Sequence, residues 1–262
     1  MIAKQIQTTS RSFIKTSTKV ITLGDGKRTT IHIARYPRAT TAIKLIAFDQ
    51  PQKLSTWCSE QGIQEALSGG FFLRVTEQPL GDFWVDGHRL PSTPIAAEWA
   101  KQRGSAHISK SGYLRLGPRR AFPGRPDPSA SLLQAGPLLV EDGSSLINDA
   151  DSEGFRTASR QFDSDISDGR YPRAAIGYNQ NTIFSLAVDG RSDDDAGMTL
   201  NELADAFIEL GATCALNLDG GCSTSQISIG VFQNKSRGGG KEYKGGYPIC
   251  NALVFQDISQ SR

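Results

Sequence analysis

Two aspartates in the second half of the chain each follow an apolar run and precede a glycine. Asp189 ends the run Ile183 to Val188, and Asp219 ends the run Ala212 to Leu218, 30 positions further on. That interval fits a strand, a crossover helix and a second, parallel strand, which predicts both acids at the carboxyl edge of one sheet. Ligands bind at such edges, so we expect the two carboxylates to face a common cleft. Paired carboxylates can stabilise a positively charged transition state, activate water or attack directly.

The elements that must position these acids can be read from the chain between them. Thr199 to Glu202 forms a capping box, Leu200, Leu203, Ala204, Phe207 and Ile208 fall on one helical face, and Gly211 ends the turn. Further strands are expected in a hairpin around Gly24-Asp25-Gly26 and at Ala42 to Phe48, Leu138 to Val140 and Asn251 to Phe255, the last in the central sheet. We predict an α+β fold with a mixed sheet and flanking helices, in one domain over residues 18–262 after a tail at 1–17.

Three segments lack hydrophobic periodicity and are expected to be loops. They are Gly117 to Ser131, the acid-rich Asn148 to Asp168, and the basic, glycine-rich Asn234 to Pro248, for which we expect a mobile loop. The acidic runs Asp163 to Asp168 and Asp193 to Asp195 lack the spacing of a calcium-binding loop, which favours solvated loops.

The composition narrows the functional class. The 262 residues include 29 basic and 27 acidic side chains, and this balance argues against nucleic acid or an anionic membrane as the main partner. Four cysteines and three histidines are widely scattered, so we predict neither a metal nor a cofactor. A chain without an export signal is expected in a reducing compartment, so we predict free thiols. No stretch approaches the length of a membrane span and no export signal is visible, so we expect a cytoplasmic protein, or an exported one if a leader has been removed.

An ordered series of six motifs carries a resemblance to a known family. They are SGGFF at 68–72, QAGPLLV at 134–140, RAAIG at 173–177, DGR at 189–191, ELA at 202–204 and NLDGGCST at 217–224. The series resembles the phosphodiester glycosidase family, whose members include the uncovering-enzyme type of N-acetylglucosaminidase, over about Ala66 to Phe255. The resemblance implies hydrolysis of a sugar-1-phosphodiester to free sugar and a phosphomonoester, with a small-molecule or glycan substrate that carries a sugar-1-phosphate linkage.

The motifs supply the candidate site. Asp189 and Asp219 are the candidate catalytic residues, and arginine suits the departing phosphate because its planar fork meets two oxygens at once. Backbone N–H groups of the two Gly-Gly pairs could add an anion-binding nest. The expected substrate-binding residues are Ser68, Gly69, Gly70, Gln134, Gly136, Arg173, Arg191, Glu202, Asn217, Gly220, Gly221, Ser223 and Thr224.

Several of these residues also have purely structural explanations. An Asp-Gly pair after a strand is a common turn, the arginines could be surface charges, and the capping box alone accounts for Glu202. Ser223 lacks the nucleophile-elbow sequence and a nearby histidine, and Cys222 fits a small buried residue better than a catalytic thiol.

Two departures from the family pattern bear on substrate choice. Ser68 stands where the family usually has Asn, and Cys222 stands where it usually has Gly or Ser. The first keeps open a non-catalytic carbohydrate-binding or polysaccharide-assembly module. A metal-dependent phosphodiesterase would need more histidine and acidic ligands than the motifs supply.

Overall fold

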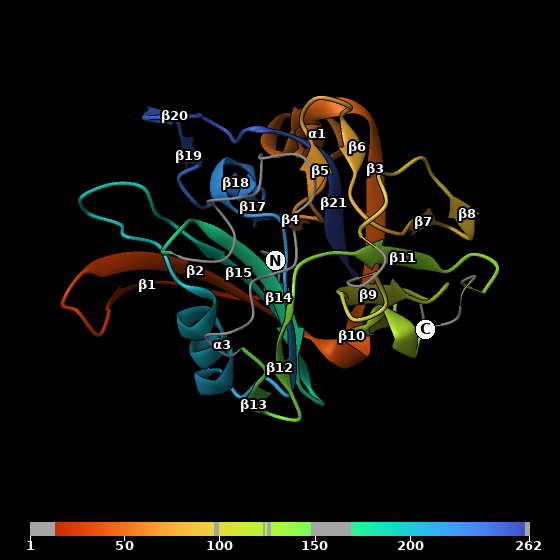
Figure 1. Ribbon diagram of the computed structural model, residues 1–262, viewed down its shortest axis with the longest axis horizontal. Coiled ribbons are helices and arrows are strands. Elements are labelled where there is room, and N and C mark those ends of the chain that lie inside the picture. Colours follow the sequence, from red (N-terminus) through yellow and green to blue (C-terminus); the bar gives the residue numbers. More distant parts are fainter. Residues whose placement is uncertain (1–13, 97–99, 123, 125–126, 148–168, 260–262) are drawn as a thin grey trace, which may run out of the picture.

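The protein is mainly β-structure arranged in three larger sheets (Figure 1). A computed structural model describes residues 14–96, 100–122, 124, 127–147 and 169–259. The predicted loop at 148–168, with its acidic run, lies outside the described residues. The α-helices with described bounds are α1 (Leu54–Gln61) and α3 (Leu200–Glu209), and 3-10 turns occur at Arg38–Thr40, Arg119–Ala121 and Gly221–Ser223. The expected α+β fold with flanking helices is therefore confirmed only in part, because strands make up most of the described structure.

The first sheet carries both aspartates and has the order β1-β2-β15-β14-β16-β12-β13. Its strands are β1 (Lys15–Thr22), β2 (Arg28–Pro37), β12 (Leu138–Glu141), β13 (Ser144–Ser145), β14 (Arg173–Tyr178), β15 (Thr182–Val188) and β16 (Cys214–Asn217). Every neighbouring pair is antiparallel, so the expected mixed sheet is wrong. The hairpin is confirmed, but β1 begins at Lys15 and takes in three residues of the expected tail.

The 30-residue spacing correctly predicts two strands that run in the same direction, although the two strands are not direct neighbours. Both β15 and β16 are antiparallel to β14, which lies between them, so they run in the same direction and end at the same edge. Helix α3 connects them and packs with its apolar face on this sheet (Figure 1). The capping box that starts α3 is present, with Thr199 and Glu202 exchanging hydrogen bonds.

The second sheet has the order β10-β9-β11-β7-β8, and the third has the order β18-β17-β4-β21-β3. The strands of the second are β7 (Phe83–Val85), β8 (His88–Arg89), β9 (Gly104–Ile108), β10 (Leu114–Pro118) and β11 (Ser131–Gln134). Those of the third are β3 (Thr41–Lys53), β4 (Ala66–Ser68), β17 (Gln226–Ser228), β18 (Val231–Phe232) and β21 (Pro248–Asp257). Two-stranded ribbons are formed by β5 (Phe72–Leu73) with β6 (Gln78–Pro79) and by β19 (Arg237–Gly238) with β20 (Lys241–Glu242). The C-terminal strand therefore belongs to the third sheet, not to the sheet that bears the aspartates.

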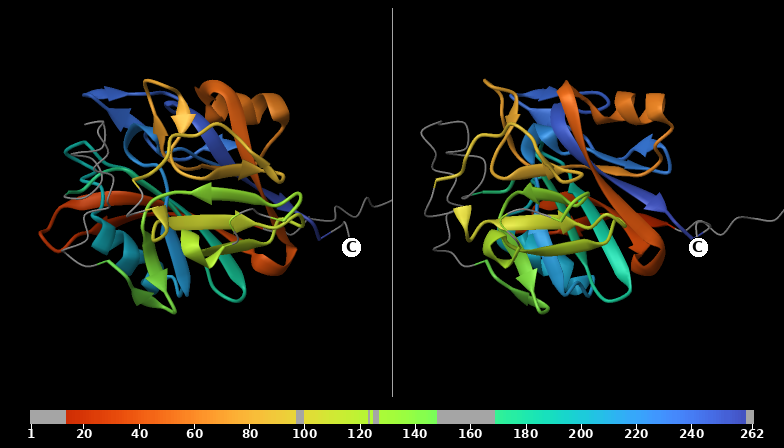
Figure 2. Two further views of the ribbon diagram at one scale, coloured as in Figure 1. Left: turned by 45° about the vertical axis from the view of Figure 1, so that its right-hand side comes forward. Right: turned by 90° about the vertical axis from the view of Figure 1, so that its right-hand side faces the viewer.

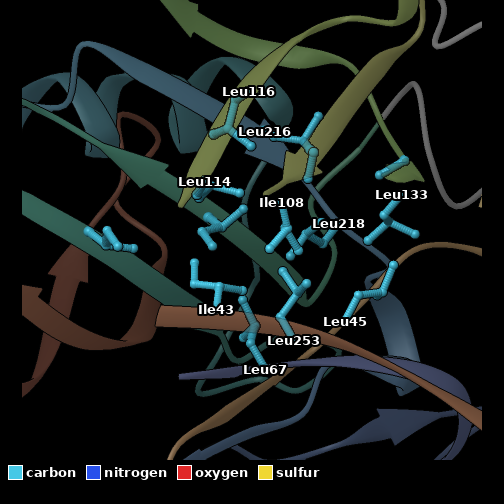
Figure 3. Close-up of a cluster of buried hydrophobic side chains, with 14 of the residues drawn as sticks. Ile43, Leu45, Leu67, Ile108, Leu114, Leu116, Leu133, Leu216, Leu218 and Leu253 are labelled. Atoms are coloured by element: carbon cyan, nitrogen blue, oxygen red, sulfur yellow. The ribbon is translucent and has the colours of Figure 1, made fainter. Parts of the chain in front are cut away.

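One apolar core joins the three sheets (Figure 3). Leu216 comes from the first sheet, Ile108 and Leu133 from the second, and Ile43 and Leu253 from the third, and all are buried. The two turned views in Figure 2 show the sheets wrapped around this centre. Loops at the strand ends are thereby fixed relative to one another, which a site built from several motifs requires.

The basic segment Asn234 to Pro248 is ordered, contrary to expectation. Asn234 and Ser236 are buried, and the segment contains the β19–β20 ribbon. The Asn234 side chain bonds to the backbone at Thr224 and Gln226, and the Lys235 N–H bonds to Asp189. Polar side chains and backbone bonds hold a stretch whose composition alone indicates mobility.

Candidate functional site

The loops that follow β15 and β16 meet at the start of β14. Arg173 pairs with Val188 on one side, and Leu218 donates its N–H to Ala174 on the other. Pro172 accepts a hydrogen bond from the Gly221 N–H at 2.8 Å. The predicted strand edge therefore brings the two Asp-Gly motifs to one place.

Asp219 is half-buried at this edge, and its backbone is fixed by the Ser68-Gly69 motif. Its N–H donates to the Gly69 carbonyl at 2.9 Å, and its own carbonyl accepts from Ser68 Oγ at 3.4 Å. Ser68 is fully buried, so its hydroxyl holds the Asp219 backbone from the protein interior. The departure from Asn at this position thus affects the support of Asp219 rather than an exposed surface.

Arg191 lies against the loop that carries Asp219. Its guanidinium donates to the Arg237 carbonyl at 3.2 Å and lies 5.4 Å from the centre of the Tyr171 ring. Gly221 has a φ of 60°, the left-handed region that favours glycine, and a Cβ added there would lie 3.3 Å from Arg191 Nη2. Arg191 has a φ of 61°, a conformation that a non-glycine residue adopts when its surroundings enforce it.

Arg74 is a second cation at the same loop. Its Nη2 donates to Cys222 Sγ at 3.1 Å. The pKa of the Cys222 thiol is raised, mainly because the thiol is buried; the nearby Asp219 charge raises it further, and Arg74 and Arg191 act in the opposite direction. Cys222 is thus in electrostatic reach of one carboxylate and two guanidinium groups. We name Asp219, Arg191, Arg74 and Cys222 the Asp219 cluster.

Sequence reasoning missed Arg74. It stands two residues after the SGGFF motif in an exposed turn, and nothing in its neighbours marks it. Its position directly after a glycine-rich motif is the one signal that could have drawn attention to it.

Asp189 differs from Asp219, because the Asp189 carboxylate is shielded from solvent. It is 1% exposed, one oxygen lies 3.0 Å from His32 Nε2, and the other accepts the Lys235 N–H at 2.6 Å. The expectation that both carboxylates face a common cleft therefore fails for Asp189. A carboxylate buried with bonded partners organises the loops around it.

Arg173 and Glu202 also have structural partners. Arg173 is 2% exposed and donates to the carbonyls of Met198 and Gly169 at 2.9 and 3.1 Å. Glu202 completes the capping box and forms a bidentate pair with Arg170. The capping box confirms the structural explanation for Glu202, whereas Arg173 is a buried residue that bonds the backbone and not a surface charge.

The remaining glycine and amide positions mark close backbone approaches. Asn251 bonds the N–H groups of Gly69 and Gly70, so these groups do not form the expected anion-binding nest. Gly136 donates to the Asn217 carbonyl at 3.0 Å, and a Cβ there would lie 2.7 Å from the Asn217 amide. The side-chain amide of Gln134 is hydrogen-bonded within the protein: it accepts from the Asp82 N–H and donates to the Ala100 carbonyl.

The loop after Asp219 folds into a short 3-10 turn. Ser223 and Thr224 donate their N–H groups to Gly220 and Gly221, and both are buried. Within the described part of the chain, Thr224 Oγ1 is buried without a hydrogen-bond partner. Among the described residues, the Gly220 N–H has no backbone acceptor.

The acidic and thiol groups elsewhere have ordinary surroundings. Asp193 and Asp194 are exposed, as expected for a solvated loop. Asp195 is buried, and its carboxylate accepts hydrogen bonds from the N–H and the hydroxyl of Thr30, so this residue is structural. All four cysteines are free thiols, as predicted. The described residues contain no helix long and apolar enough to cross a membrane.

Comparison with known proteins decides the family. The family model for phosphodiester glycosidases matches residues 61–256. The chain belongs to the phosphodiester glycosidase family. This confirms the resemblance carried by the six motifs.

The relatives show how far the likeness extends. N-acetylglucosamine-1-phosphodiester alpha-N-acetylglucosaminidase of Bos taurus is 28% identical over 179 residues, which are 65% of this chain and 32% of that protein. The chain thus matches about a third of the length of this curated relative. The auto-inhibited catalytic domain of the zebrafish enzyme superposes with a TM-score of 0.69 at 19% identity, covering 95% of this chain and 85% of that one.

Two further solved structures share the fold at lower identity. A hypothetical protein from Synechocystis has a TM-score of 0.63 at 18% identity, covering 92% of this chain and 62% of that one. A putative exported protein from Burkholderia pseudomallei has a TM-score of 0.59 at 13% identity, covering 88% and 74%. These likenesses establish the fold, and the cytoplasmic location expected from the sequence stays a prediction.

Proposed function

We propose that the protein hydrolyses the glycosidic bond of a sugar-1-phosphodiester, releasing free sugar and a phosphomonoester. The observation that carries this proposal is the Asp219 cluster, in which one half-buried carboxylate lies with two guanidinium groups around the same loop. Family membership supports the same reaction class. The substrate is a small molecule or glycan with a sugar-1-phosphate linkage.

In this proposal Asp219 faces the anomeric carbon. Breaking the anomeric C–O bond builds oxocarbenium character on the sugar ring, and a carboxylate stabilises that charge or attacks the carbon. The phosphate that departs is already a good leaving group, so cations that hold it are more valuable than a strong general acid. Arg191 and Arg74 supply these cations, because guanidinium groups bind two phosphate oxygens in one plane.

Asp189 takes a supporting part. Its oxygens are occupied by His32 and the Lys235 N–H, and the segment that begins at Lys235 reaches Arg237, whose carbonyl accepts from Arg191. Asp189 is therefore a positioning residue for Arg191 rather than a second reacting carboxylate.

The deciding experiment follows free sugar released from UDP-N-acetylglucosamine and from a panel of synthetic sugar-1-phosphodiesters. We expect Asp219→Asn to lower the rate about 100-fold or more, a magnitude typical for the loss of a group that stabilises transition-state charge. Asp205→Asn, which removes an exposed acid on α3, is the matched control and should retain full activity. Unaltered thermal unfolding of Asp219→Asn shows that the loss is chemical.

The alternative function is a non-catalytic carbohydrate-binding or exopolysaccharide-assembly module. It is favoured by the replacement of the usual Asn by Ser68 beneath Asp219. If wild type and Asp219→Asn are equally inert toward every phosphodiester in the panel but bind the sugars, this alternative replaces the hydrolase.

A further inference from the structure

A cavity of about 500 Å³ lies beside the second sheet and shares no lining residue with the Asp219 cluster. Its walls carry the cations Arg89, Lys101, Arg119 and Arg120, the carboxylate Asp82, and the apolar side chains of Ile95 and Phe122. The described lining residues therefore carry a net charge of +3. The sheet that bears it, β10-β9-β11-β7-β8, lies on the right of Figure 1.

Asp82, the one acid among the described lining residues, is already engaged in an ion pair. Asp82 lies 2.8 Å from Arg119 Nε, and Arg119 also donates to the Phe122 carbonyl at 3.1 Å. Arg89 is 63% exposed and reaches Asp82 at 3.4 Å, a longer contact. Asp82 and Arg119 thus neutralise each other and form part of the wall.

Lys101 and Arg120 are the lining cations that do not take part in this ion pair. Both side chains are exposed, and neither has a carboxylate within ion-pair distance among the residues that the structure describes. The Arg120 N–H donates to the Lys101 carbonyl at 2.9 Å, which holds the backbones of the two residues together. Like charges carried by neighbouring backbone positions at a concave surface attract an anion.

The floor of the cavity is rigid. Gln134 is 2% exposed, and its amide accepts from the Asp82 N–H at 2.9 Å and donates to the Ala100 carbonyl at 2.6 Å. A Cβ on Gly81 would lie 2.7 Å from Gln134 Oε1, so glycine there allows this bond. Because these side chains are already fixed, the protein loses less conformational entropy when a ligand binds.

We propose that this cavity binds an oxyanion of the phosphate class carried on a small organic body. The volume lies in the usual range for small-molecule sites. Lys101 and Arg120 would hold the anion, with Arg89 at the rim, and Ile95 and Phe122 would contact the body. This site goes beyond the proposed hydrolase function, because none of its residues takes part in the bond cleavage argued above.

Calorimetry with inorganic phosphate tests the site. The titrations use an Arg74→Gln/Arg191→Gln background, which removes both guanidinium groups of the Asp219 cluster, so that phosphate bound there does not contribute to the signal. We expect Lys101→Gln/Arg120→Gln to weaken binding about tenfold or more, as for the loss of charge-assisted hydrogen bonds. The control Lys44→Gln/Lys110→Gln removes two exposed cations outside this cavity and should change the affinity less than about twofold.

A second titration separates the two sources of the anion. Glucose 6-phosphate should bind more tightly than inorganic phosphate if the apolar wall contacts an organic body. Equal affinity for both overturns that part of the proposal. Three results overturn the site: no phosphate binding in the Arg74→Gln/Arg191→Gln background, unchanged affinity in the cavity variant, or equal weakening in the control. Each result is independent of whether Asp219 catalyses hydrolysis.

Discussion

The Asp189 carboxylate accepts the backbone N–H of Lys235 at 2.6 Å and thereby ties the end of β15 to the segment before β19. Two residues further along, the Arg237 carbonyl accepts from Arg191. Arg237 also donates to Ser192 and Asp195 in the loop after β15. Position 189 is therefore linked to the Arg191 guanidinium through the folded basic segment.

Asp189→Asn tests this link. The variant replaces one carboxylate oxygen by an amide, so either His32 or the Lys235 N–H loses its acceptor, and we expect unfolding to become easier by about 1–3 kcal/mol in urea titrations. Below the unfolding transition, KM for a phosphodiester should rise because Arg191 is held less firmly. Asp193→Asn, at an exposed acid of the same loop, should be neutral in both assays. A large fall in kcat with unchanged KM would instead assign Asp189 to the chemical step.

Arg191 is predicted to act on the leaving group. Arg191→Gln should lower kcat/KM for a sugar-1-phosphodiester about 10- to 100-fold, because a charge-assisted hydrogen bond to phosphate is lost. Arg191→Lys should restore part of the rate, since it keeps the charge but not the planar fork. For a nitrophenyl sugar, whose leaving group carries no phosphate, the same variants should lose much less. Equal losses on both substrates would contradict a role in holding phosphate.

The sequence predicts the elements around the site because its local signals agree with the fold. The acid at the end of each apolar run, the capping box at Thr199 and the 30-residue interval together give the shared edge of β15 and β16. The strand inserted between them, β14, has no such signal, because pairing partners are set by contacts far apart in the chain. For the same reason, the sequence does not predict that β21 belongs to the third sheet.

Side-chain orientation sets the other limit. Asp189 and Asp219 have the same local sequence signature, yet the first is closed by His32 and Lys235 and the second is half-buried beside cations. His32 lies 157 positions from Asp189 and shares no motif with it. Arg74 contacts the site from a turn that carries no motif, so its role cannot be predicted from sequence motifs.

Gly69 is predicted to be intolerant of any side chain. A Cβ at Gly69 would lie 2.1 Å from Asn251 Oδ1, inside the third sheet that supports Asp219. Gly69→Ala should therefore destabilise the protein by about 1–3 kcal/mol through overpacking. Gly24→Ala is the matched control, because a Cβ at Gly24 meets nothing within 4 Å. Thermal unfolding of both variants checks this, and equal stability would show that Asn251 moves aside without cost.

The Glu202 pair with Arg170 predicts an acid-dependent loss of stability. Burial raises the pKa of Glu202, but hydrogen bonds from Arg170 and Thr199 outweigh it and leave the pKa below its ordinary value of about 4.3. The folded state thus holds the ionised form more firmly than the unfolded state does. This contribution is present above the ordinary pKa and disappears as the pH falls through the lowered one.

Glu202→Gln removes the charge but can keep the capping box, since glutamine also caps. At pH 7 it should cost about 0.5–1 kcal/mol, and the difference from wild type should vanish in acid, in urea titrations between pH 7 and pH 3. Glu209→Gln, at an exposed acid on the same helix, should show no such pH dependence. A deficit for Glu202→Gln that persists unchanged at pH 3 would mean that the ion pair is not its cause, and that the amide disturbs the cap itself.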